Sequence, residues 1–197
     1  MTQSESQVRQ SLVAAAADLL SRRGFTATSI RELAKYANAP VGSIYHYFPG
    51  GKLQVTAEAL QFAGNRIEEG LAKALKAGPL VGLRHFLGVW RDIMRKSNFL
   101  AGCPVLSVAT AEFAPGENTY ILDIAAKIFA GWETLLRKSL TDQGLLDSQA
   151  QKLATLIVAA TEGSVAVCRA KRSIQPLETI TEQLETMIEN ALSQIKE

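Results

Sequence analysis

Apolar residues recur along this 197-residue chain at intervals of three and four positions, the spacing of one face of an α-helix. The first such stripe runs from Val8 to Leu20, and Gly24 follows it as a residue suited to end a helix. No stretch alternates apolar and polar residues over the length that a β-strand needs. The pattern therefore predicts an all-α fold.

Glycine, proline and asparagine divide this pattern into nine predicted helices. By residue number they cover about 8–23, 29–37, 41–48, 52–76, 80–95, 102–113, 121–140, 148–169 and 176–195. Ser29 and Glu32 have the spacing of a capping box at the start of the second helix. Ser148 is the expected cap of the eighth.

The second and third predicted helices are short and flank a tight turn at Asn38-Ala39-Pro40. This arrangement is typical of a helix-turn-helix whose second helix enters the major groove of DNA. Ile44 and Phe48, four positions apart, would anchor that helix. The positions left for solvent or DNA are Val41, Gly42, Ser43, Tyr45, His46 and Tyr47. Adjacent aromatics usually fill a core, but this helix is too short to bury every side.

Charge adds a modest indication of the same kind. Residues 1–52 hold six lysines or arginines against three acidic residues, although the whole chain has a net charge of only +2. A basic surplus is expected where a segment meets phosphate. An ordinary solvated surface would give the same surplus.

Composition places the chain among cytoplasmic globular proteins. Hydrophobic residues make up 47% and charged residues 20%, and no stretch approaches the roughly 20 continuous apolar residues of a membrane span. The first ten residues are polar and carry no secretory signal. Cys103 and Cys168 are too few and too far apart for a zinc motif, so we expect buried thiols and no metal.

Signatures of catalysis are absent from the sequence. Lys52 follows two glycines, but a phosphate-binding loop needs a glycine where His46 stands, and no Ser or Thr follows the lysine. There is no Gly-x-Ser-x-Gly motif, and the two histidines, His46 and His85, do not form a metal-binding pair. We therefore expect no catalytic residues, no cofactor and no enzyme.

The N-terminal segment resembles the DNA-binding headpiece of the TetR family of transcriptional regulators. The resemblance covers about fifty residues, through Gly24-Phe25, the run from Thr28 to Ala34, the run from Ala39 to Tyr45, and Tyr47-Phe48 with a following lysine. It implies a DNA-binding domain at 1–52 and an effector-binding and dimerisation domain at 53–197. Gly102-Cys103-Pro104-Val105-Leu106 and the Gly-Gly-Lys turn are similar to the lincomycin- and flavonoid-responsive LmrA/YxaF-like branch.

The resemblance also implies roles for particular residues. Those that would face DNA are Arg31, Val41, Gly42, Tyr45 and His46, with Ser29 and Lys52 on phosphates. Pro40 and Val41 depart from the polar or basic residues common in the family, so base reading would depend on Arg31 and His46, with thymine methyls meeting Pro40 and Val41. The lysine also lies one residue later than usual.

The larger domain contains enough aromatic and aliphatic residues to line a pocket for a small lipophilic effector. The candidates are Phe62, Phe86, Trp90, Met94, Phe113, Phe129 and Trp132. Polar residues that could orient a ligand are His85, Arg91, Thr110, Glu112 and Glu162. Core packing explains the apolar set equally well, and exposed helix faces explain the polar set.

The last two predicted helices suit an interface between two copies of the chain. The eighth is rich in small residues, and the ninth carries an apolar stripe from Leu177 to Ile195. A twofold dimer would place two recognition helices about 34 to 36 Å apart on a palindromic operator. The same helices would alternatively close the core of a monomer.

These features predict a repressor that a small effector releases from its operator by a population shift. The alternative is a constitutive DNA-binding or adaptor protein whose larger domain binds a protein partner. Release of DNA by a ligand would distinguish the two.

Overall fold

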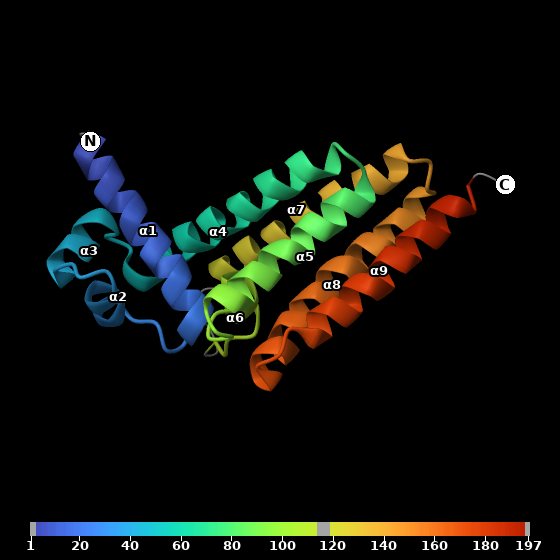
Figure 1. Cartoon of the computed structure of the whole chain (residues 1–197). Helices are drawn as coiled ribbons and strands as arrows, with labels where there is room; N and C mark the ends of the chain where they lie inside the picture. The colour runs from blue at the N-terminus through green and yellow to red at the C-terminus, as the bar shows by residue number, and fades with distance from the viewer. Residues whose placement is uncertain (1–2, 114–118, 196–197) are drawn as a thin grey trace. The chain divides into compact units, whose positions relative to one another are not determined.

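The computed structural model describes residues 3–113 and 119–195 (Figure 1). These residues form nine α-helices and no strand, which confirms the all-α prediction. The helices are α1 (Gln3–Arg23), α2 (Ile30–Tyr36), α3 (Val41–Tyr47), α4 (Gly51–Leu75), α5 (Pro79–Lys96), α6 (Pro104–Ala109), α7 (Tyr120–Asp142), α8 (Asp147–Lys171) and α9 (Gln175–Ser193).

The chain divides into two compact units, each assembled from separate parts of the sequence. The first contains residues 1–65 and 103–128, and the second contains residues 66–102 and 129–197. The division therefore falls within α4 and α7. These units are defined by how the chain packs. The division into a DNA-binding domain at 1–52 and an effector-binding and dimerisation domain at 53–197 stays a prediction.

The core of the first unit includes the apolar faces of α1 to α4. Its buried residues include Leu12, Ala16, Leu19, Leu20, Leu33, Ile44, Phe48 and Leu60. A polar contact joins α1 to α2, because Tyr36 of α2 donates a hydrogen bond to the Asp18 carboxylate of α1, which also accepts one from Arg22 within α1. The bond to Asp18 raises the pKa of Tyr36, since an ionised phenol could not donate it. Arg23 pairs with Glu32 in the same way.

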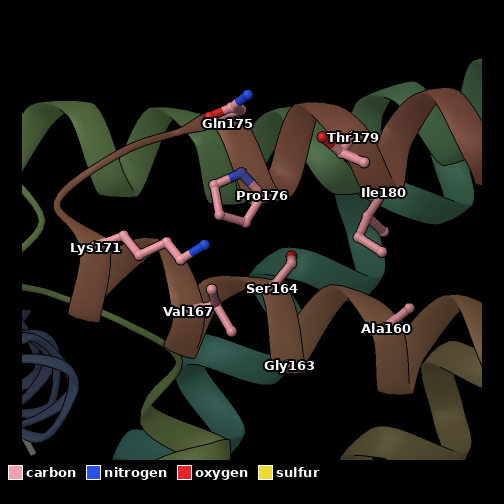
Figure 2. Close-up of a pocket in the computed structure, with 9 residues that line it drawn as sticks. All are labelled: Ala160, Gly163, Ser164, Val167, Lys171, Gln175, Pro176, Thr179 and Ile180. Carbon is pink, nitrogen blue, oxygen red and sulfur yellow. The ribbon is translucent and has the colours of Figure 1, made fainter.

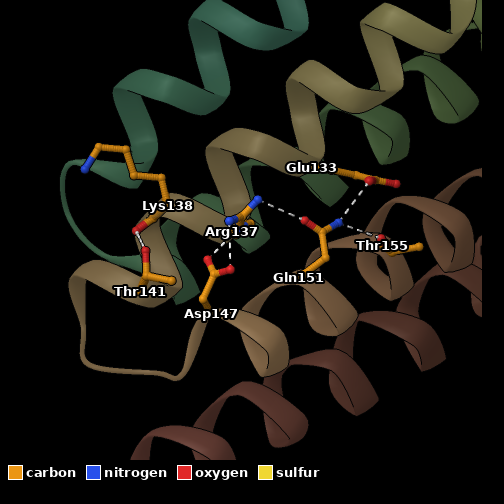
Figure 3. Close-up of polar contacts among 7 residues, drawn as sticks. All are labelled: Glu133, Arg137, Lys138, Thr141, Asp147, Gln151 and Thr155. Atoms are coloured by element: carbon orange, nitrogen blue, oxygen red, sulfur yellow. Dashed lines mark hydrogen bonds and ion pairs between the residues drawn. The ribbon is translucent and has the colours of Figure 1, made fainter.

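The second unit is a bundle in which α5, α8 and α9 pack together. Its buried residues include Leu71, Leu83, Phe86, Leu87, Trp90, Met94, Trp132, Ile157, Leu177, Leu184 and Ile188. The N-terminal end of α8 is fixed to α7 by Arg137, which donates to both carboxylate oxygens of Asp147 at 2.7 and 2.8 Å and to Gln151 at 3.4 Å (Figure 3). A bidentate pair of this kind fixes direction as well as distance.

Among the described residues, α8 is the one helix long and apolar enough to cross a membrane. Nearly half of its apolar window is buried within the structure. The core helix of a globular protein meets the same criterion. The packing of α8 on α5 and α9 accounts for the apolar residues on its buried face.

Three predicted helix ends were wrong, and each has a physical reason. The first helix begins at Gln3 and not near Val8, because its backbone extends into a polar stretch that no apolar stripe marks. Ser148 does not cap α8, which begins at Asp147, where a carboxylate in the first turn favours the helix dipole and meets Arg137. The sixth helix ends at Ala109 and does not reach Phe113. Phe113 leaves the helical path and stacks on Phe25, with ring centroids 5.4 Å apart.

Candidate DNA interface

The turn between α2 and α3 has the geometry that its residues favour. Ser29 caps α2 and accepts the Glu32 N–H at 3.1 Å, as the capping box predicts. The other half of the capping box is wrong, because the Glu32 carboxylate pairs with Arg23 of α1 and does not accept the Ser29 N–H. Asn38 adopts a left-handed φ of 49°, and Pro40 is the N-cap of α3. The sequence of the turn therefore orients α3 relative to α2.

One side of α3 is anchored and the other faces outward. Ile44 and Phe48 are completely buried, as their spacing predicts. Tyr45 is 52% exposed, and Val41 and His46 are exposed beside it. The two anchors thus present one outer face of a short helix, which is the geometry for insertion into a groove.

The remaining candidates on α3 differ in accessibility. Gly42 is exposed, and no atom lies within 4 Å of the position that a Cβ would take there. Ser43 and Tyr47 are half-buried, and the Tyr47 ring meets the edge of His46 with centroids 5.0 Å apart. Gly42 therefore allows backbone to approach DNA, whereas Tyr47 also supports His46.

Three candidates precede α3 and lie at the surface. Ser29, Arg31 and Pro40 are all exposed. Arg31 forms no hydrogen bond or ion pair with the described residues, whereas Arg23 is held by Glu32. The Arg31 guanidinium is thus available to a base or a phosphate.

Lys52, at the start of α4, is half-buried. Its Nζ lies 3.9 Å from the centroid of the Phe25 ring, within the range of a cation–π contact. The extra residue in the preceding turn is accommodated by Gly51, whose φ is +64°. Sequence reasoning missed the Phe25 contact, because the ring and the ammonium are far apart in the chain and no local pattern joins them.

The seven pocket candidates are divided between the two units. Four of them, Phe86, Trp90, Phe129 and Trp132, meet edge to face in the second unit, with neighbouring centroids 5.5 to 6.4 Å apart. Met94 is buried in the same unit. Phe62 and Phe113 belong to the first unit. The Trp90 indole N–H is buried and has no acceptor among the described residues.

The polar residues proposed to orient a ligand divide by exposure. His85, Thr110 and Glu112 are exposed, as expected for residues on exposed helix faces. Arg91 is half-buried, and its Nε has no partner among the described residues. Glu162 is buried. Arg91 and Glu162 are therefore the two that packing does not place at the surface.

A surface groove of about 570 Å³ runs between α8 and α9 (Figure 2). Gly163, Val167 and Lys171 line it from α8, and Pro176 and Ile180 line it from α9. It is lined mainly by small and apolar side chains, with the Lys171 ammonium at one end.

Comparison with known proteins finds regulators of transcription over nearly the whole chain. Residues 12–59 match the family described as bacterial regulatory proteins, tetR family. Residues 79–183 match the C-terminal domain of transcriptional regulators described as LmrA/YxaF-like. The first match covers the helix-turn-helix, and the second covers α5 through about the first half of α9.

Individual relatives agree with these matches. The chain is 30% identical to the uncharacterised HTH-type transcriptional regulator Rv0196 of Mycobacterium tuberculosis, over 91% of this chain and 93% of the relative. It is 25% identical to the HTH-type transcriptional regulator LmrA of Bacillus subtilis, over 86% and 90%.

Solved structures share the fold. A TetR regulator from Agrobacterium tumefaciens matches with a TM-score of 0.80 at 21% identity, over 95% of this chain and 98% of that one. A TetR regulator from Chloroflexus aurantiacus matches with a TM-score of 0.78 at 25% identity, over 95% and 96%.

Proposed function

The chain belongs to the TetR family of DNA-binding transcriptional regulators, in its LmrA/YxaF-like branch, and we propose that it is a repressor released from its operator by a small lipophilic effector. The main support for the proposal is the exposed face of α3, which points outward because Ile44 and Phe48 on the opposite face are buried. Members of this family are regulators, and we expect this chain to have no catalytic activity. It would act in the cytoplasm, where it meets DNA.

The DNA contacts that we propose follow from exposure and chemistry. We assign base reading to Arg31 and His46, two exposed side chains that can hydrogen-bond to base edges, and Arg31 can do so bidentately to guanine. Pro40 and Val41 offer apolar contact to thymine methyls. The proposed phosphate contacts come from Ser29, Ser43, Tyr45, Tyr47 and Lys52.

We propose that the operator is palindromic and that the chain binds it as a homodimer through α8 and α9. Much of the apolar stripe of α9 serves the monomer, because Leu177, Leu184 and Ile188 are buried within the second unit. What supports an interface is the other side of these helices, where Val167 and Met187 are more than 40% exposed. Ala159, Gly163 and Ala166 add an exposed strip of small residues beside them.

The proposed effector site includes the aromatic cluster of the second unit. Rings meeting edge to face supply an apolar surface that suits a lipophilic ligand. The buried N–H of Trp90 has no acceptor among the described residues, so it offers a donor to a ligand that enters there. The effector would act by favouring a dimer whose headpieces are wrongly spaced for the operator.

The test begins with selection of duplexes from a randomised pool by the purified full-length protein. Enrichment of a palindromic sequence is the expected result, and failure to enrich any sequence would overturn the DNA-binding role. Lipophilic compounds are then screened for a rise in melting temperature, and each hit is titrated into the complex with fluorescent duplex. Release of the duplex supports the repressor, whereas tight DNA binding that no hit weakens supports the constitutive DNA-binding or adaptor alternative.

A further inference from the structure

The turn that ends α3 is held by side chains from outside the helix-turn-helix. The Arg9 guanidinium of α1 lies 5.1 Å from the centroid of the Phe48 ring, and it donates to the Glu58 carboxylate of α4 at 2.6 Å. Gln54 donates to the same carboxylate at 3.1 Å and accepts the Gly50 N–H at 2.8 Å. We refer to Arg9, Gln54 and Glu58 as the turn network.

We propose that Glu58 is a positioning residue for sequence-specific DNA binding. Its carboxylate holds Arg9 against the last residue of the recognition segment and holds Gln54 against the backbone of the turn. The proposal rests on the DNA-binding function proposed above. It adds that the angle of α3 depends on an acidic residue that does not itself face DNA.

The composition of the turn explains why such support is needed. Gly50 and Gly51 have no side chains with which to fix themselves, and Gly51 adopts a φ of +64°. A Gly-Gly turn loses more conformational freedom on ordering than any other pair, so neighbouring groups must fix it. The Gly50 N–H is fixed by Gln54, and Gln54 is fixed by Glu58.

Burial gives the network its strength. The Arg9 and Glu58 side chains are 31% and 22% exposed, so their ion pair is less screened than one at a fully open surface. Loss of the Glu58 carboxylate would remove the acceptor of both the Arg9 guanidinium and the Gln54 NH2 group, so Gln54 would be held only by its bond to Gly50. Both effects loosen the same turn.

A loosened turn should affect base contacts more than phosphate contacts. Hydrogen bonds to base edges require a close distance and a good angle, so His46 must approach at one orientation of α3. Phosphate contacts tolerate more movement, because they are largely electrostatic. Affinity for the operator should therefore fall while affinity for random duplex is mostly kept.

The experiment uses the full-length protein and the duplex that it enriches from a randomised pool, with a scrambled duplex for comparison. Glu58→Gln keeps an acceptor for Gln54 but removes the charge that holds Arg9, and Glu58→Ala removes both. We expect losses on the order of tenfold for the enriched duplex and smaller losses for the scrambled one, within the range of networked residues. Lys138→Ala breaks an ion pair with Asp142 that lies within α7 in the second unit, and it should leave both affinities unchanged.

A mutant cycle separates positioning from a general loss of stability. Among the described residues, no hydrogen bond joins Arg9 to Gln54. If the two residues act independently, the fold-loss in operator affinity of the double variant should equal the product of the fold-losses of Arg9→Ala and Gln54→Ala. If Glu58 connects the two residues, the double variant should lose less operator affinity than that product. In the Glu58→Ala background, neither Arg9→Ala nor Gln54→Ala should weaken operator binding further. Thermal unfolding of each variant verifies that binding is measured on folded protein.

The outcomes are distinguishable. If the wild type enriches no sequence, the proposed function fails before Glu58 is tested. If it enriches one, the inference is overturned by Glu58→Gln affinities within about twofold of wild type, by parallel losses on both duplexes, or by losses that multiply. Should Glu58→Ala not fold, Glu58→Gln and the Arg9 and Gln54 variants still decide the question.

Discussion

Arg23 and Arg31 illustrate how one ion pair separates two arginines of the headpiece by role. The Arg23 guanidinium is held by the Glu32 carboxylate and joins α1 to α2. Arg31, next to Glu32 in the chain, is exposed and has no partner among the described residues. The arginine that packing does not use is the one that can read a base.

Replacing Arg31 with Ala should weaken binding to the operator more than binding to random duplex. A bidentate contact of Arg to guanine contributes about 1 to 3 kcal/mol of discrimination. Titrations of both duplexes at several salt concentrations provide the measurement. If Arg31 instead meets a phosphate, both affinities will fall in parallel and the slope of log affinity against log salt will drop by about one.

Lys52 contacts the Phe25 ring, and a neutral variant of similar length tests whether it also meets a phosphate. Lys52→Met keeps the packing of the side chain on Phe25 but removes the charge. If the ammonium meets a phosphate, affinity for operator and random duplex should fall alike and the salt slope should drop by about one. Lys96→Met, in the second unit, is the matched control. A lower melting temperature with unchanged DNA affinity would assign Lys52 to the cation–π contact alone.

Helix ends show what local sequence can predict and where it fails. Gly24 and Asn38 adopt left-handed backbone where the sequence predicts helix ends, and Ser29 caps α2, because each depends on its immediate neighbours. Ser148 failed as a cap because Asp147 meets Arg137, ten residues earlier, on another helix. The turn network was not predicted, since Arg9 and Glu58 are 49 positions apart and no helical pattern connects them.

Gly163 provides a test of the α8 and α9 interface that leaves the monomer intact. A Cβ at Gly163 would meet no atom within 4 Å in the single chain, so Gly163→Leu should fold and gain about 1 kcal/mol of helix propensity. At a dimer interface the larger side chain would obstruct the partner. Sedimentation should show a wild-type dimer and a weakened dimer in the variant.

The control for this test is Gly88→Leu in α5, where a Cβ likewise meets no atom within 4 Å. It should not change the oligomeric state. A wild-type protein that sediments as a monomer at micromolar concentration would contradict the dimer, and an unaffected Gly163→Leu dimer would place the interface elsewhere.

The seam between α5 and α9 should respond to acid. Arg84 donates to Glu185 at 2.9 and 3.0 Å, and this hydrogen bond lowers the pKa of Glu185 from its ordinary 4.5. A lowered pKa in the folded state contributes stability above the unfolded pKa, and that contribution is lost as pH falls through the folded value. Glu185→Gln should therefore lower the urea midpoint at pH 7, and its difference from wild type should shrink below about pH 4.5. A constant difference across this range would indicate that the pair does not couple to folding.

In the proposed mechanism, operator binding and effector binding are two sides of one equilibrium of the whole molecule. If an effector weakens operator binding by a given factor, the operator must weaken effector binding by the same factor. A compound that raises the melting temperature should thus bind less tightly, by about 5 to 150-fold, when saturating operator duplex is present. Calorimetric titration with and without duplex measures this factor. Equal affinities would mean that the compound binds without acting as an effector.

Because the first compact unit combines two separate parts of the sequence, it cannot complete its folding until the second part has been synthesised. Its residues 1–65 leave the ribosome well before residues 103–128, which complete its packing and bring Phe113 to Phe25. At roughly 5 to 20 residues per second, the 63 residues from 66 to 128 take about 3 to 13 s to synthesise. During that interval the DNA-binding segment is present in the cell without the rest of its core. Nascent chains halted soon after residue 65 should therefore be digested by protease, whereas those extended well past residue 128 should resist it.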